Sequence, residues 1–72
     1  MEYSNKFGQR VKELRDEKEL TQKQLAKFMN VNQTTIHYWE TRNDETDYTT
    51  LCRLAEFFGV SVGYLLGVEE FN

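Results

Sequence analysis

Apolar residues along this chain recur at helical spacing in five short stretches, separated by polar corners. Residues three, four and seven positions apart fall on one side of a helix, so each stretch predicts a helix with one buried face. The clearest stripe is Leu51, Leu54, Ala55 and Phe58. The expected helices span residues 4–18, 22–29, 33–41, 48–58 and 62–66. Nothing is left over for a sheet, so the 72 residues predict one compact all-α domain.

Polar residues and glycines at the corners mark where these helices begin and end. Thr21 and Gln24 have the spacing of a capping box, in which each side chain bonds to the backbone of the other residue. A short polar side chain precedes each of the last three helices and can cap it: Asn32, Asp47 and Ser61. Glycines that can adopt left-handed backbone follow the last two helices, at Gly59 and Gly67.

The aromatic residues are mostly core candidates. The chain has five phenylalanines, four tyrosines and one tryptophan, and large rings at helical spacing usually bury their area. We therefore expect Phe7, Phe28, Trp39 and Phe58 in the core. Tyr38 directly precedes Trp39 and should point away from the core, where it can meet a ligand.

The segment from Thr21 to Thr41 predicts two helices around a tight corner, and the second of them has two unlike faces. Ile36 and Trp39 lie three residues apart and should face inward. Amides, hydroxyls and an imidazole fall on the opposite face: Gln33, Thr34, His37, Tyr38 and Thr41. A helix anchored on one side and polar on the other suits the major groove of DNA.

This segment resembles the helix-turn-helix of the phage repressor and Cro family, also called the xenobiotic-response-element family. The resemblance rests on a set of residues within 21–41: Gln22, Leu25, Ala26, Val31, Thr35, Ile36, Trp39 and Glu40. Matching flanks extend it over residues 7–15, 51–61 and 65–67. Only the two chain ends and the loop after Glu40 fall outside. The resemblance implies a five-helix domain with a central helix-turn-helix over residues 21–41.

The resemblance also implies which residues meet DNA. Gln33, Thr34 and Tyr38 match base-reading positions, and His37 matches a position that varies between base contact, phosphate contact and plain exposure. Gln22 matches a glutamine that meets phosphate at the start of the first helix of the motif. Thr41 and Arg42 match phosphate contacts at the end of the second helix.

The loop after Arg42 departs from the family pattern. Asn43 stands where a glycine is usual and can take the same left-handed conformation. Asp44 and Glu45 replace expected cations and should repel a DNA backbone. Either this loop swings away from DNA or the phosphate clamp is weaker than usual.

Two further expectations follow from the resemblance. Arg15 and Glu40 match an ion pair that fixes the angle of the reading helix. The last helix and its flanks match a dimer contact, with Val62, Leu65, Tyr64 and Phe71 as candidates. For these four residues a purely structural role in the core remains an equal alternative.

Net charge is −3, but its distribution is uneven. Residues 1–42 carry eight basic and six acidic side chains, whereas residues 43–72 carry one basic and six acidic. Phosphate neutralisation supplies most of the general affinity for DNA. We therefore expect weak binding to DNA of arbitrary sequence, and a dependence on base contacts and dimerisation.

The residue inventory argues against an enzyme, a metal centre and a cofactor site. There is one histidine and no glycine-rich phosphate loop, and residues 44–47 lack the ligand spacing of a calcium loop. Cys52 is the single cysteine, so an internal disulfide is excluded, and an unpaired cysteine fits a reducing cytoplasm. We expect its side chain to be half-buried beside Leu51. No apolar run approaches membrane-spanning length, and residues 1–5 lack a targeting signal.

These observations predict a cytoplasmic regulator that binds double-stranded DNA at a near-palindromic operator, as a homodimer and as a repressor. A second hypothesis stays open. The acidic second half suits a protein-interaction module, of the antitoxin or anti-repressor type, in which DNA binding is secondary or lost.

Overall fold

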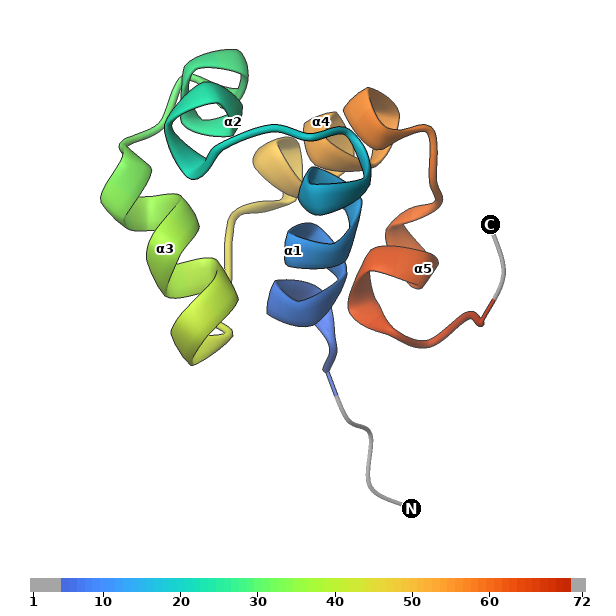
Figure 1. Cartoon of the computed structure of the whole chain (residues 1–72). Helices are drawn as coiled ribbons and strands as arrows, with labels where there is room; N and C mark the ends of the chain where they lie inside the picture. Colours follow the sequence, from blue (N-terminus) through green and yellow to red (C-terminus); the bar gives the residue numbers. More distant parts are fainter. Residues whose placement is uncertain (1–4, 71–72) are drawn as a thin grey trace.

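The five predicted helices are present in the computed structural model, which describes residues 5–70 (Figure 1). They are α1 (Phe7–Glu17), α2 (Gln22–Met29), α3 (Gln33–Arg42), α4 (Tyr48–Phe58) and α5 (Val62–Leu66). No strand occurs within the described range, so the all-α prediction is confirmed. The bounds of α2, α4 and α5 are those predicted, and α3 is one residue longer.

The first helix begins at Phe7, so the expected start near Ser4 or Asn5 is wrong. The Asn5 side chain accepts a hydrogen bond from the Phe7 N–H at 2.8 Å. The Lys6 N–H donates to the Leu66 carbonyl at 3.1 Å. These bonds satisfy the backbone before α1 and tie it to the end of α5, so no further helical turn is needed. Ser4 lies outside the described residues.

Most of the predicted helix signals operate. Both bonds of the capping box are present: the Thr21 hydroxyl accepts from the Gln24 N–H at 3.0 Å, and the Gln24 amide oxygen accepts from the Thr21 N–H at 2.8 Å. The Ser61 hydroxyl accepts from the backbone of α5 at 2.9 Å. Asp47 and Asn32 hold the N-cap positions of α4 and α3. Neither side chain forms a cap bond to the helix backbone, which corrects the prediction for both residues.

Left-handed residues end four of the helices. Gly59 and Gly67 stop α4 and α5 with φ of 69° and 83°, as predicted. Asparagines do the same for α2 and α3, at Asn30 (φ 58°) and Asn43 (φ 56°). Asparagine tolerates this region better than other non-glycine residues, so the missing glycine after α3 is replaced without loss of the stop.

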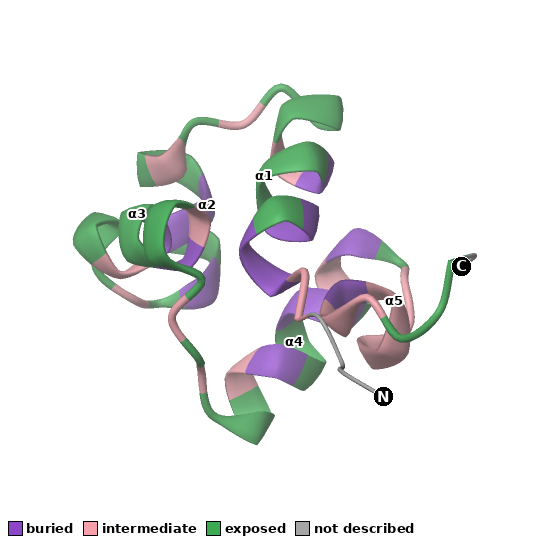
Figure 2. Cartoon of the chain, turned by 90° about the horizontal axis from the view of Figure 1, so that it is seen from below, coloured by how far each residue is buried: buried purple, intermediate pink, exposed green. Residues whose placement is uncertain are grey.

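The core draws apolar side chains from all five helices, which turn their buried faces to one another (Figure 2). Trp39 and Ile36 of α3 are 2% and 0% exposed. The Trp39 ring packs edge-on against Phe7 of α1, with centroids 5.5 Å apart. A Cβ atom at Gly8 would collide with the Trp39 carbonyl oxygen, so α1 and α3 cross in close contact at this glycine.

Two expected burial states are wrong. Phe28 is 56% exposed, because Met29 takes the core position of α2 and turns Phe28 toward the side, where its ring lies 5.2 Å from that of Phe57. Cys52 is exposed rather than half-buried, since Leu51 beside it occupies the inward position of α4. Phe7, Trp39 and Phe58 are buried as predicted.

Candidate nucleic-acid interface

Helix α3 presents its polar face to solvent along the edge of the molecule (Figures 1 and 2). Four predicted base-reading residues are exposed on it: Gln33, Thr34, His37 and Tyr38. Ile36 and Trp39 hold the opposite face in the core. A row of exposed donors and acceptors on a rigid helix can enter the major groove and meet base edges.

The carboxylate of Glu40 fixes the end of α3 against two other helices. Arg15 of α1 donates to it from Nε at 2.7 Å and from Nη2 at 3.0 Å. The Glu40 side chain is 2% exposed and that of Arg15 is 12% exposed, so this bidentate pair is shielded from water. The hydrogen bond to Glu40 raises the pKa of Arg15 above its ordinary value. The charge of the guanidinium is therefore constant over the whole physiological pH range.

Gln22 also belongs to this network. Its Nε2 donates at 3.0 Å to Glu40 Oε1, the oxygen that also accepts from Arg15 Nη2, and this bond ties the start of α2 to α3. The side chain is half-buried, so the predicted phosphate contact would use the remaining amide hydrogen and the free backbone N–H groups at the start of α2. Arg15 further donates to the Leu20 carbonyl at 2.7 Å, which secures the corner before α2.

At the end of α3 the predicted phosphate contacts already have partners within the chain. The Thr41 hydroxyl donates to the His37 carbonyl at 2.8 Å. The Arg42 guanidinium lies 2.6 Å from the Asp44 carboxylate and stacks over the Tyr38 ring, 3.9 Å from its centroid. The hydrogen bond to Asp44 raises the pKa of Arg42 above its ordinary value. Both side chains are exposed and would have to exchange these partners for phosphate.

The residue that ends α3 also clamps it to α1. Asn43 Oδ1 accepts from the Gly8 N–H at 2.7 Å, and Asn43 Nδ2 donates to the Asn5 carbonyl at 2.9 Å. Sequence reasoning assigned Asn43 only its left-handed backbone and missed this clamp. The available signal was Gly8, because a glycine inside a helix marks a close approach by another backbone.

Two lysines of the amino-terminal part were also missed. A shallow polar groove of about 440 Å³ runs between the start of α1 and the end of α3. Its lining combines both helices: Asn5, Lys6, Gly8, Gln9, Lys12, Glu40, Thr41 and Asn43. Lys12 also pairs with Asp16 at 3.4 Å, on the exposed side of α1. The helix-turn-helix motif could not predict these lysines, because Lys6 and Lys12 precede residues 21–41 in the sequence and reach the end of α3 only through the fold.

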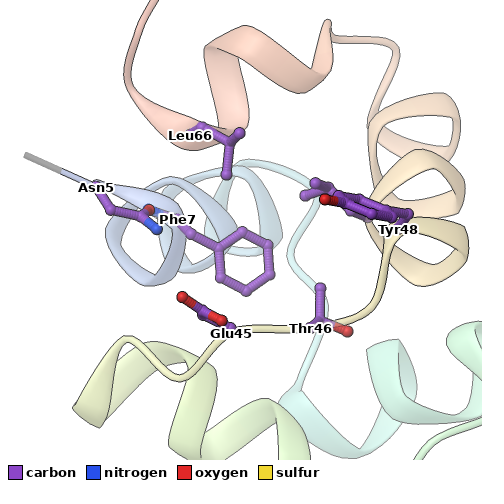
Figure 3. Close-up of a pocket in the computed structure, with 7 residues that line it drawn as sticks. Asn5, Phe7, Glu45, Thr46, Tyr48 and Leu66 are labelled. Carbon is purple, nitrogen blue, oxygen red and sulfur yellow. The ribbon is translucent and has the colours of Figure 1, made fainter. Parts of the chain in front are cut away.

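A second hollow lies between α1, the loop after α3, α4 and the end of α5, and its lining is less polar. It measures about 260 Å³ and is lined by Asn5, Phe7, Glu45, Thr46, Tyr48, Leu51 and Leu66 (Figure 3). Its lining contains one carboxylate and no cation, so it does not suit a phosphate. Nearby, a hydrogen bond with the Thr50 side chain holds the pKa of the Asp47 carboxyl below its ordinary value. No group of three or more metal-ligating side chains occurs in the part of the chain described.

The candidate dimer contacts divide. Leu65 is 0% exposed and lies in the core, which favours the structural alternative that the sequence left open for this residue. Val62 and Tyr64 are half-buried, and the Arg10 guanidinium lies 4.2 Å from the centroid of the Tyr64 ring. Phe71 lies outside the described residues. No described helix is long and apolar enough to cross a membrane.

A family model described as Helix-turn-helix matches residues 11–65. The chain belongs to this helix-turn-helix family. It is 36% identical over 64 residues to the HTH-type transcriptional activator BcrR of Enterococcus faecalis, over 89% of this chain and 31% of that protein. The HTH-type transcriptional regulator ImmR of Bacillus subtilis (strain 168) is 35% identical over 64 residues, over 89% of this chain and 50% of that protein. The cryptic phage CTXphi transcriptional repressor RstR of Vibrio cholerae is 29% identical over 66 residues, over 92% of this chain and 60% of that protein.

These relatives confirm the predicted phage repressor and Cro type. The three relatives are named as an activator, a regulator and a repressor of transcription. The matched region spans between 31% and 60% of the length of the three relatives described above.

Proposed function

We propose that this chain binds a specific double-stranded DNA site with α3 in the major groove and represses transcription from it. The observation that carries the proposal is the division of α3 into two faces. Ile36 and Trp39 are buried and Glu40 is held by Arg15 and Gln22, while the base-reading residues stand in solvent. Side chains held on a rigid support lose little freedom on binding, which favours selective contacts.

The proposed base contacts follow from side-chain chemistry. Gln33 lies in the first turn of α3, the part that reaches deepest into the groove, and its amide can pair bidentately with adenine. Thr34 and Tyr38 offer hydroxyls and apolar surface to base edges and thymine methyls. His37 offers a ring nitrogen to a base or a phosphate.

The proposed phosphate contacts flank this helix at both ends. Gln22 and the start of α2 serve one end, and Thr41 and Arg42 serve the other. The groove that holds Lys6 and Lys12 adds two cations beside Thr41. They partly offset the acidic residues that follow Arg42.

We further propose that two copies bind together. One helix reads only a few base pairs, and two-fold related half-sites would lie about 34–36 Å apart, one turn of DNA. Val62 and Tyr64 on α5 remain the candidate contacts between copies. Repression needs only occupancy of a promoter, which a domain of this size can supply, and one relative is named a transcriptional repressor.

Selection of bound duplexes from a random library tests the proposal. The expected result is one enriched, near-palindromic sequence. In mobility-shift titrations Gln33→Ala should then weaken binding to that site by about 1–3 kcal/mol and relax the preference at one base pair of each half-site. Glu56→Ala, which changes an exposed residue of α4, is the control and should leave both unchanged. Absence of any enriched sequence would refute the proposal.

The alternative, a protein-interaction module, has its own structural support. The exposed ring of Phe28 lies beside Phe57 on the α2–α4 side, next to a hollow of about 310 Å³. A module of this kind would lack both an enriched site and the steep salt dependence of DNA binding. For DNA binding, the logarithm of the association constant falls with the logarithm of the salt concentration, with a slope of about −0.9 per phosphate neutralised.

A further inference from the structure

The end of α3 contains a cation whose charge is already engaged inside the chain. Arg42 Nη2 lies 2.6 Å from Asp44 Oδ2, and its Cζ lies 3.9 Å from the centre of the Tyr38 ring. Tyr38 is one helical turn before Arg42, so the guanidinium stacks on its ring on the proposed DNA-facing side of α3, and Asp44 pairs with the same guanidinium. The guanidinium is covered by a ring on one side and paired with a carboxylate at its edge.

The position of Asp44 is set by the fold and not only by its side chain. Its backbone N–H donates to the Tyr38 carbonyl at 3.3 Å, which closes the end of α3. The preceding residue, Asn43, is left-handed and is clamped to Gly8 and Asn5 of the α1 segment. The backbone that carries the Asp44 carboxylate is therefore held in place beside Arg42. The Asp44 side chain is 39% exposed, and that of Arg42 is 58% exposed.

We propose that Asp44 acts as an internal competitor of the DNA phosphate for Arg42. A carboxylate and a phosphate offer the same pair of oxygens to a guanidinium. Binding to DNA must therefore replace one such partner by the other, and most of the gain from a new phosphate contact is lost. Asp44 in this way sets a low affinity for DNA of any sequence. This inference rests on the proposed function.

Glu45 provides a matched control next door. It carries the same charge and is exposed, but its side chain lines the hollow beside Phe7 and not the surface of Arg42 (Figure 3). A general repulsion of DNA by the acidic loop would make both residues equally unfavourable. Competition for Arg42 would single out Asp44.

The test compares Asp44→Asn, Glu45→Gln, Arg42→Gln and the double variant Arg42→Gln/Asp44→Asn. Fluorescence anisotropy measures their binding to a mixed-sequence duplex and to the selected operator, between about 50 and 200 mM salt. Asp44→Asn should bind both duplexes about three- to tenfold more tightly, and its log–log salt slope should steepen by about 0.9. Glu45→Gln should gain less than about twofold, because its charge is screened by salt. In the Arg42→Gln background the gain from Asp44→Asn should vanish.

A readout without DNA checks the contact itself. In the free protein Asp44→Asn should shift the NMR signals of the Tyr38 ring and the Arg42 Nε–H, whereas Glu45→Gln should leave them in place. Equal gains from Asp44→Asn and Glu45→Gln, a gain that survives Arg42→Gln, or unmoved NMR signals would each overturn the inference. If the wild-type protein still binds its operator in those cases, the proposed function stands and only the role of Asp44 is refuted. If the wild-type protein binds no duplex, both the proposed function and the role of Asp44 are refuted.

Discussion

The Glu40 carboxylate connects α3, the proposed reading helix, to two other helices. It accepts three hydrogen bonds, two from Arg15 and one from Gln22, and so joins α1, α2 and α3 at one point. Because it is almost completely buried, removing it leaves a shielded guanidinium without a counter-charge. Such a loss is larger than the gain from making the pair.

Glu40→Ala should therefore lower stability by about 3 kcal/mol and should also weaken operator binding. Urea denaturation measures the first effect and a mobility-shift titration the second. Glu13→Ala, which removes an exposed carboxylate of α1, should change stability by less than about 0.5 kcal/mol. The double variant Arg15→Met/Glu40→Met should regain stability without regaining DNA affinity. Wild-type affinity in either Glu40 variant would contradict a positioning role.

The two phenylalanines whose burial the sequence did not distinguish predict different costs. Phe58→Ala removes a side chain that is 8% exposed and should destabilise the protein by about 3–5 kcal/mol. Phe28→Ala removes one that is 56% exposed and should cost less than about 1 kcal/mol. Thermal or urea unfolding of both variants checks this ranking, and equal losses would contradict the burial seen in the structure.

Among elements, the crossing of α1 and α3 determines how α3, the proposed reading helix, is presented. Gly8 lets the two backbones approach, and a methyl group there would meet the Trp39 carbonyl oxygen. Gly8→Ala should therefore destabilise the protein by about 1–3 kcal/mol through overpacking, although alanine is the better helix former. Gly63→Ala is the control, because the atoms nearest to its methyl belong to the flexible side chain of Glu69, which can move aside. Circular dichroism melts of the two variants test the difference.

The Asn43 clamp has a prediction of its own at the same scale. Asn43→Gly keeps the left-handed backbone but loses the bonds to Gly8 of α1 and to Asn5 before it, and should cost about 1–2 kcal/mol. Asn43→Ala loses the bonds and also strains the backbone, and should cost about 1 kcal/mol more. Urea titrations of the two variants separate the cost of the lost hydrogen bonds from the cost of the backbone strain. Identical stability of the two variants would mean that the left-handed conformation carries no strain.

Prediction from sequence succeeded where spacing carries the information. The stripe of α4, the capping box of Thr21 and the glycine stops all depend on local geometry, which is written in consecutive residues. Phe28 and Met29 could both satisfy the stripe of α2, and only the packing of α4 against it decides between them. The partners of Asn43 and Gln22 lie 35 and 18 residues away, at distances that periodicity does not reach. The base-reading assignments remain predictions.

For the whole molecule, burial of Leu65 changes the expected route to a dimer. Leu65→Arg should unfold the protein, because a charge without a partner would enter the core. Val62→Lys, at a half-buried position of α5, should instead leave a folded protein that sediments as a monomer and binds its operator weakly. Analytical ultracentrifugation and circular dichroism of both variants test this. A Val62→Lys protein that still binds as a dimer would move the contact between copies elsewhere.

The separation of supporting and reading residues on α3 has a practical consequence. Ile36, Trp39 and Glu40 hold the helix in place, and none of them is among the side chains that would touch a base. Gln33, Thr34 and His37 can accordingly be exchanged for other residues without loosening the scaffold. New operator preferences should be reachable by randomising these three codons alone, with Tyr38 kept because Arg42 lies on its ring.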